Sequence, residues 1–453
     1  MRSFILRNKF LIILLLAITS CSKDKDYDKA KAITAYIADN SLIVDESLKN
    51  SPIILPKQKL NLNFLGSLSL LNQENENIAK NFSKNSNKIF NKKNKFSIKK
   101  TWSKSIFYSS AKNENFHFEP IINNQKIYFL DSSGMLFAYD LQAKKLIWNS
   151  QIFEKSLIQN YRTPQISMHQ DKIYATIGSN FLVAVNATDG KVIWQKQVSA
   201  ILTSKPVISD NFIYVVSDNN HLYCFDIENA ELNFLHMGVD RSTAILGSSM
   251  PVIYKDKILV SYSSGEVYAL NKKTGEVLWV IDLNLNKAIS SDFYLNDVDA
   301  NLIVKNDQLY AISNSGLLKA IDVKNGSVIW KKQIASIANF WVANDYLFLI
   351  NNDNKLIAIN RLNGKIKWIK DLPAYENPKK PASKFIYNSV IIAGDKLVIL
   401  RNDGVLIIAS PQDGSIENNY SIGKKIFHSP VIVNDKIYLQ TVGRFTIEII
   451  ELN

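Results

Sequence analysis

Cysteine is almost absent from this chain, because the 453 residues include only Cys21 and Cys224. Two cysteines cannot build the disulfide framework of a small secreted domain. The five histidines form no H-x-x-x-H or H-E-x-x-H pair, so no metal site is expected. The sequence also lacks a G-x-S-x-G elbow, a phosphate-cradling glycine loop and a dinucleotide fingerprint. These absences favour a protein that is not an enzyme and has no cofactor.

An apolar run near the amino terminus, Phe10–Ile18, is too short to cross a bilayer as a retained helix. Three basic residues precede it, and this order is typical of an export signal over residues 1–20. The tetrapeptide I-T-S-C that ends at Cys21 resembles a bacterial lipobox. The resemblance implies cleavage before Cys21 and lipidation of that residue. Ser22 in place of aspartate favours the outer membrane.

Residues 21–95 are rich in asparagine and lysine, and we expect them to form a lipidated tether. A short helix is predicted at 28–39, with Asp28 as its N-cap. Nine lysines and no acid lie between Lys80 and Lys104. This run fits a basic tether on anionic lipid, or a solvated linker of biased composition. An exported chain has no obvious nucleic acid to meet, so the net charge of +13 does not predict one as a partner.

The rest of the chain is organised by a repeat, of which Ser264–Trp279 is a clear copy. Its polar and apolar residues alternate as in a strand, and an Asx-containing turn leads into a second strand that carries an aromatic residue. The aromatic follows the Asx residue by eight positions. The six copies are Asp140 and Trp148, Asn186 and Trp194, Asp226 and Phe234, Asn271 and Trp279, Asp322 and Trp330, and Asn360 and Trp368.

Two further positions stay in phase with this pair. Six residues before the Asx position lies a residue that readily adopts positive φ: Gly134, Asn180, Asn220, Gly265, Gly316 and Asn354. Two residues before it lies a small residue: Ala138, Ala184, Cys224, Ala269, Ala320 and Ala358. Such a repeat, with a period of about 40–50 residues, is typical of β-propellers.

A seventh copy is degenerate, because it carries Ser410 at the Asx position and Asn418 at the aromatic position. An eighth copy begins at Pro430 but stops before an aromatic strand. We expect the missing strand at 96–102, because pairing it with the last blade would remove two exposed sheet edges. The sequence therefore predicts an all-β fold over 96–453. It would be an eight-bladed β-propeller of four-stranded antiparallel blades, closed by an N-terminal strand. Seven blades remain the alternative if the degenerate seventh copy is not a blade.

The repeat resembles the tryptophan-docking repeat of pyrroloquinoline-quinone enzymes, which are eight-bladed propellers. Those enzymes hold their cofactor against a vicinal disulfide, and this chain has no Cys-Cys pair. The resemblance therefore implies the fold rather than the activity. A quinoprotein-like dehydrogenase stays open as an alternative, as does a surface lipoprotein that binds glycan or host protein.

The order of lipobox, tether and propeller resembles the BamB family of the β-barrel assembly machinery. A D-V-D stretch in that family contacts the periplasmic POTRA domains of BamA, and here it corresponds to Asp297 and Asp299. The family's second contact loop corresponds to Ile245 and Leu246, where Leu246 replaces an arginine. The resemblance implies a non-enzymatic, lipid-anchored scaffold on the periplasmic face of the outer membrane. Its partners would be BamA and the other barrel-assembly subunits.

Overall fold

The structure is a computed structural model. It describes residues 42–65, 77–78, 98–107, 119–154, 164–239, 250–284, 302–314, 316–376, 384–426, 429–433, 436–441 and 445–452. In this part of the chain the helical structure is a single 3-10 turn, η1 (Glu46–Leu48). All other regular elements are strands, so the all-β prediction is confirmed.

Seven four-stranded sheets are formed by consecutive strands. Sheet 1 contains β2 (Ile121–Asn123), β3 (Lys126–Leu130), β4 (Met135–Asp140) and β5 (Lys145–Gln151); sheet 2 contains β6 (Gln165–His169), β7 (Lys172–Thr176), β8 (Phe181–Asn186) and β9 (Val192–Gln197); sheet 3 contains β10 (Val207–Ser209), β11 (Phe212–Val216), β12 (His221–Asp226) and β13 (Leu232–Met237); sheet 4 contains β14 (Val252–Tyr254), β15 (Lys257–Ser261), β16 (Glu266–Asn271) and β17 (Val277–Asp282). Sheet 5 contains β18 (Ile303–Lys305), β19 (Gln308–Ile312), β20 (Leu317–Asp322) and β21 (Val328–Gln333); sheet 6 contains β22 (Trp341–Ala343), β23 (Tyr346–Ile350), β24 (Lys355–Asn360) and β25 (Ile366–Asp371); sheet 7 contains β26 (Tyr387–Ala393), β27 (Lys396–Arg401), β28 (Val405–Ala409) and β29 (Ile416–Ser421).

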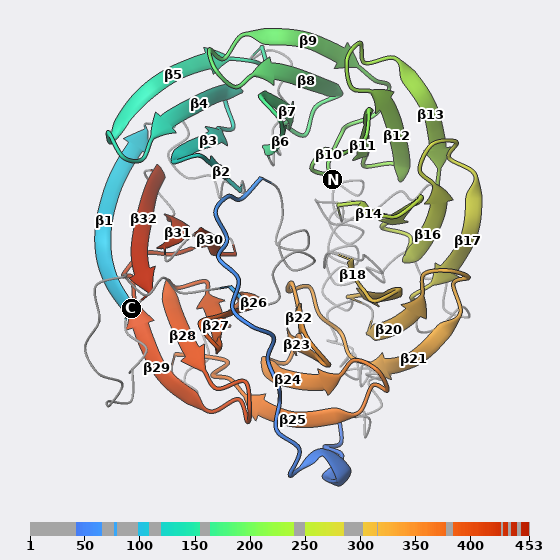
Figure 1. Cartoon of the computed structure of the whole chain (residues 1–453), viewed down its shortest axis with the longest axis vertical. Coiled ribbons are helices and arrows are strands. Elements are labelled where there is room, and N and C mark those ends of the chain that lie inside the picture. Colours follow the sequence, from blue (N-terminus) through green and yellow to red (C-terminus); the bar gives the residue numbers. More distant parts are fainter. Residues whose placement is uncertain are drawn as a thin grey trace, which may run out of the picture. The chain divides into compact units, whose positions relative to one another are not determined.

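Sheet 8 joins the two ends of this unit of the chain. Its strands are β30 (Val431–Val433), β31 (Lys436–Thr441), β32 (Phe445–Leu452) and β1 (Ile98–Phe107), in that order. The strand expected at 96–102 is therefore found as β1, which pairs antiparallel with β32. Figure 1 shows the sheets following one another around a ring, with the fourth strand of each sheet on the perimeter. Repeated four-stranded antiparallel sheets are the arrangement expected of a β-propeller.

The turn between the third and fourth strands is fixed by the Asx residue of the repeat. Asp140 Oδ1 accepts hydrogen bonds from the backbone N–H groups of Gln142 and Ala143 at 2.8 and 2.7 Å. The same side-chain-to-backbone bond is formed in the next five sheets by Asn186, Asp226, Asn271, Asp322 and Asn360. In sheet 7 the Ser410 hydroxyl takes this role at 3.2 Å. The repeat thus marks a side-chain-supported turn, as predicted.

The small and aromatic positions of the repeat face each other across the third and fourth strands. The cross-strand partners are Ala138 and Trp148, Ala184 and Trp194, Cys224 and Phe234, Ala269 and Trp279, Ala320 and Trp330, and Ala358 and Trp368. Each small residue is fully buried. The need for a small residue is explained by the bulky ring opposite it, since close cross-strand neighbours share one packing space.

Each tryptophan of the repeat also docks on the following sheet. Its indole N–H donates to the carbonyl of the residue after the next Asx position, at 2.7–3.3 Å: Trp148 to Ala187, Trp194 to Ile227, Trp279 to Val323, Trp330 to Arg361 and Trp368 to Pro411. Except for Trp194, the ring lies against a glycine of that same turn. A Cβ added at Gly364, for example, would come within 2.8 Å of Trp330. The repeat therefore encodes the contact between neighbouring sheets as well as each sheet.

Two details differ from the sequence prediction. Positive φ is found at Gly134, Asn220, Gly265, Gly316 and Asn354 but not at Asn180. The Asn180 side chain donates to the Val198 carbonyl at 3.2 Å. In addition, residues 43–65 and 77–78 of the expected tether pack on the sheets. We call these residues the strap.

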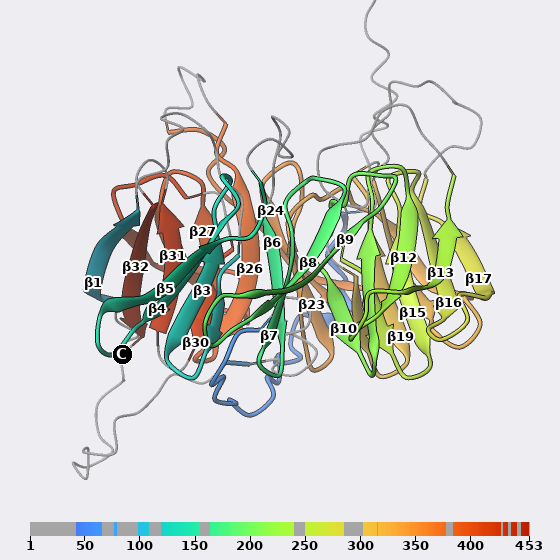
Figure 2. The same ribbon diagram turned by 90° about the horizontal axis from the view of Figure 1, so that it is seen from above.

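The turns of each sheet alternate between two ends, because neighbouring strands are antiparallel. Turns from the first to the second strand, and from the third to the fourth, lie at one end, which we call the turn face. The connections from one sheet to the next lie at the other end, which we call the connection face. The strap bonds to residues of the turn face. In Figure 2, where the ring is seen edge-on, the strap is drawn in blue below the strands.

Candidate interaction surface

The predicted contact residues fall in two connections between sheets that the structure does not describe. Ile245, Leu246, Asp297 and Asp299 lie outside the described residues, as does the predicted lipidation site Cys21. The strands that flank both connections are described. The first connection links β13 to β14 and the second links β17 to β18, so both leave from the connection face on the two sides of sheet 4.

The stem of the first connection is held by Asn220, in the turn between β11 and β12. Its backbone carbonyl accepts from Gly238 N–H at 2.8 Å, and its side-chain amide donates to the Val239 carbonyl at 2.7 Å. Its Oδ1 accepts from the backbone N–H and the hydroxyl of Ser263 in sheet 4, at 3.1 and 2.9 Å. One asparagine with a φ of 60° thereby ties the last residues before the connection to the neighbouring sheet.

Aromatic side chains fill the space beneath this stem. His236 stacks on Tyr262, with ring centroids 5.8 Å apart and an interplanar angle of 5°, and its Nδ1 lies 2.8 Å from the Tyr262 hydroxyl. Burial lowers the pKa of His236, with a smaller contribution from His221. Burial also raises the pKa of Tyr262 well above its ordinary value. Both shifts favour neutral rings, which share one hydrogen bond whose donor is set by the imidazole tautomer.

The stem of the second connection is fixed by hydrogen bonds around Gly265. Leu283 N–H donates to the Gly265 carbonyl at 2.8 Å, and the Asn284 side chain donates to the Ser264 carbonyl at 3.0 Å. Gly265 has a φ of +89°, and a Cβ there would lie 2.4 Å from Asn284 Oδ1. The Ser313 hydroxyl of sheet 5 donates to the Leu283 carbonyl at 3.2 Å. Both connections thus start from rigid stems.

An apolar stripe runs along β13 and past its end toward the first connection. Leu235, Met237 and Val239 point outward and are 38%, 65% and 51% exposed. Polar residues occupy the same outward positions of sheet 2: Gln195, Gln197 and Ser199. The sequence analysis missed this stripe, although alternation with the inward Phe234 and His236 could have revealed it. Exposed apolar residues gathered in one place are typical of interaction sites.

Catalytic chemistry has little support among the residues that the structure describes. No group of three or more His, Cys, Asp or Glu side chains there is placed to hold a metal ion. Cys224 is buried opposite Phe234, and burial raises the pKa of its thiol to about 12. A thiol with that pKa is protonated at neutral pH and is a poor nucleophile. Within the same described part, none of the helical segments has the length and apolar character that a membrane crossing requires.

Comparison with known proteins adds sequence evidence to this geometry. A family model described as outer membrane protein assembly factor BamB matches residues 160–370. BamB of Yersinia pestis is 24% identical over 363 residues, which cover 78% of this chain and 90% of that protein. The resemblance to BamB is confirmed. An uncharacterized protein of Rickettsia prowazekii is 29% identical over 227 residues, or 49% of this chain and 54% of its own length.

Two solved structures have folds similar to that of this chain. The crystal structure of BamB from Moraxella catarrhalis has a TM-score of 0.65 at 17% identity and covers 78% of this chain and all of that one. A quinohemoprotein alcohol dehydrogenase from Comamonas testosteroni has a TM-score of 0.59 at 12% identity and covers 78% of this chain and 76% of its own. At these identities the likeness concerns the fold alone.

Proposed function

We propose that this protein is a non-enzymatic scaffold lipoprotein of the outer-membrane β-barrel assembly machinery. The observation that carries the proposal is the alignment with BamB of Yersinia pestis, which spans 90% of that assembly factor. In this proposal the eight sheets are eight blades that β1 closes into a ring over 96–453. Residues 1–20 are the signal, and lipid on Cys21 holds the protein at the periplasmic face of the outer membrane.

The partner surface in this proposal is the connection face around sheet 4. Asp297 and Asp299 are two residues apart, so an extended segment would project both carboxylates to one side. Such a pair would steer a basic surface of the BamA POTRA domains and set its orientation. Ile245 and Leu246 would add an apolar contact. The exposed stripe that includes Met237 supports this proposal, because it leads along the outer strand toward the same connection.

Co-purification with BamA from detergent-solubilised membranes tests the proposal. We expect Asp297→Ala with Asp299→Ala to reduce the recovered BamA, and Leu246→Ala to reduce it further, at an unchanged thermal melt. The matched control is Asp189→Ala with Asp413→Ala, because both carboxylates are exposed in turns of the opposite face. Full BamA recovery with the triple variant at normal expression would overturn the contact site.

The likeness in fold to a quinohemoprotein alcohol dehydrogenase supports one other candidate, a quinone-dependent dehydrogenase. Adding pyrroloquinoline quinone and calcium to the purified protein separates the two functions. Bound quinone, seen by its absorbance and fluorescence, would favour the dehydrogenase. The third possibility, a surface lipoprotein that binds glycan or host protein, is tested by protease shaving of intact cells. Protection from shaving is expected of a periplasmic scaffold.

A further inference from the structure

Sheet 7 lacks the aromatic side chain through which other sheets dock on their neighbours. At the aromatic position of β29 lies Asn418, and its cross-strand partner is Ile408 rather than a small residue. An asparagine offers no ring to cover the next turn. The junction between sheets 7 and 8 therefore differs from the junction between sheets 6 and 7, where Trp368 donates to the Pro411 carbonyl at 3.0 Å.

The strap begins on sheet 6, one sheet before this junction. Val44 pairs in parallel with Ile366 at the outer edge of the sheet. The Asp45 carboxylate lies 3.0 Å from the Lys365 ammonium group. The Lys367 ammonium group donates to two carbonyl groups at the end of η1, which is where a helix leaves acceptors unsatisfied. Lys367 is buried although it lies on an outer strand, because the strap covers it.

On sheet 7 the strap is held by backbone-like hydrogen bonds. The side-chain amide of Gln412 donates to the Ile53 carbonyl at 2.7 Å and accepts from the Ile53 N–H at 2.8 Å. Ile78 N–H donates to the Ile392 carbonyl at 3.1 Å, and the Ile78 carbonyl accepts from Gly394 N–H at 2.8 Å. Both residues of the strap are therefore bound as a neighbouring strand would be.

The strap then reaches sheets 8 and 1. The Asn61 side chain donates to the Ile432 carbonyl of β30, and Asn61 is only 5% exposed. Phe64 and Ile122 exchange two backbone hydrogen bonds at 2.7 and 2.8 Å. The strap thus bonds to sheets 6, 7, 8 and 1, and the Leu65 carbonyl also accepts from Met168 N–H of sheet 2 at 3.3 Å. Figure 1 shows the strap crossing the ring.

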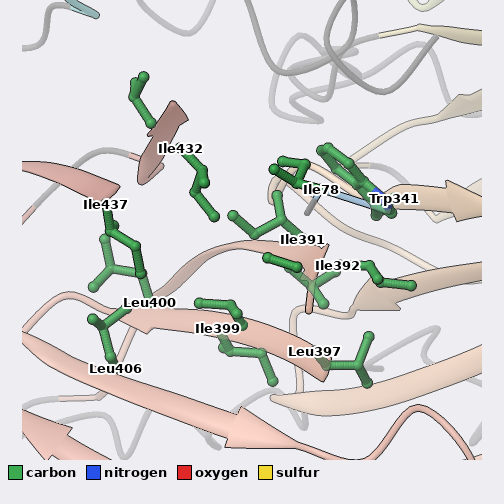
Figure 3. Close-up of a cluster of buried hydrophobic side chains, with 14 of the residues drawn as sticks. Ile78, Trp341, Ile391, Ile392, Leu397, Ile399, Leu400, Leu406, Ile432 and Ile437 are labelled. Atoms are coloured by element: carbon green, nitrogen blue, oxygen red, sulfur yellow. The ribbon is translucent and has the colours of Figure 1, made fainter. Parts of the chain in front are cut away.

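The buried side chains of the strap unite these four sheets in one core. Ile53, Phe64 and Ile78 are 3%, 2% and 0% exposed, and they belong to a single apolar cluster with residues of sheets 6, 7, 8 and 1. The clusters described elsewhere in the ring each join two neighbouring sheets. The close-up of this core shows Ile78 beside Trp341 and Ile391 (Figure 3).

We propose that the strap is a clasp that keeps the ring closed where sheet 7 lacks its aromatic dock. In this proposal residues 43–65 and 77–78 belong to the ring rather than to the tether.

Hydrogen exchange of the full mature protein, followed by mass spectrometry, tests the clasp. We expect Asn61→Ala with Phe64→Ala to lower protection in β26–β31 and β2–β3 by about tenfold or more relative to β10–β21, because the lost contacts belong to those sheets. An equal loss across all sheets would overturn the proposal, since it would indicate general destabilisation. Unchanged protection in β26–β31 would overturn it as well.

A milder variant covers the case in which the double variant does not fold. Gln412→Ala removes both side-chain bonds to Ile53 and leaves the core intact. Its matched control is Gln142→Ala, the exposed residue two positions after the Asx residue in sheet 1. We expect faster exchange in β26–β31 only for Gln412→Ala. Equal exchange rates in β26–β31 of the two variants would contradict the proposal that the strap is a clasp.

Discussion

The hydroxyl of Tyr214 donates to the carbonyl oxygen of Lys272 at 2.7 Å. Lys272 follows the Asx residue of sheet 4, and in five other sheets the residue at this position receives the indole N–H of a tryptophan. Sheet 3 has Phe234 at the aromatic position, and a phenylalanine side chain has no hydrogen-bond donor. A tyrosine on β11 of the same sheet thus supplies the hydrogen bond that the phenylalanine on β13 cannot.

Removing this donor is expected to weaken the junction between sheets 3 and 4. Tyr214→Phe should lower the free energy of unfolding by about 1–2 kcal/mol, because a buried carbonyl loses its partner. Adding Phe234→Trp should restore part of the loss by returning an indole N–H. Tyr174→Phe is the matched control, since the buried Tyr174 hydroxyl has no hydrogen-bond partner among the described residues. Urea melts that give equal losses for Tyr214→Phe and Tyr174→Phe would contradict this account.

The aromatic dock itself is expected to dominate the stability of each junction. Trp330→Ala should lower the free energy of unfolding by about 3–5 kcal/mol, because it removes a large packed ring and its bond to the Arg361 carbonyl. Ile329→Ala, on the same strand but 42% exposed, should cost much less. Denaturant melts of the two variants check the difference. Similar losses would mean that the ring is not a major inter-sheet contact.

The repeat could be predicted from the sequence because each of its positions has one local physical role. Asp140 caps a turn, Ala138 makes room for a ring, and Trp148 covers the next sheet. The strap had no comparable signal. Its bonds join residues far apart in the chain, such as Gln412 and Ile53, and several of them use backbone groups that no side-chain pattern encodes. The partner residues rested on family resemblance, because a short acidic motif does not define a surface.

A backbone position in sheet 3 offers a stabilising change. Ala230 takes the turn position that is glycine in the following sheets, and its φ is 56°. An alanine in the left-handed region costs about 1–2 kcal/mol. Ala230→Gly removes this cost but gives the unfolded chain more conformational freedom, which offsets part of the gain. The free energy of unfolding should therefore rise by up to about 1 kcal/mol. The reverse change, Gly364→Ala, should destabilise, because its Cβ would meet the Trp330 ring. Calorimetric melts of both variants, shifted in opposite directions, would match this expectation.

The buried His236 is expected to make stability depend on pH. Its pKa is lowered in the folded protein by burial, so the unfolded chain binds the proton more readily. The stabilising effect of the neutral ring is fully present above about pH 6.5 and is lost as the pH falls through the lower folded pKa. His236→Gln should show a smaller decline in melting temperature between pH 7 and pH 5 than the unmodified protein. An identical decline would mean that other groups govern the acid sensitivity.

The apolar stripe on β13 should contribute to partner binding without supporting the fold. Met237→Ser with Val239→Ser replaces two side chains that are 65% and 51% exposed. The free energy of unfolding should therefore change by no more than about 0.5 kcal/mol. If the stripe continues the proposed contact surface, recovery of BamA should fall about fivefold or more, because apolar anchors carry much of the energy of an interface. The matched control is Val192→Ser with Ile193→Ser, whose side chains are 43% and 45% exposed on sheet 2. Equal BamA recovery with both double variants would assign the stripe no role in this contact.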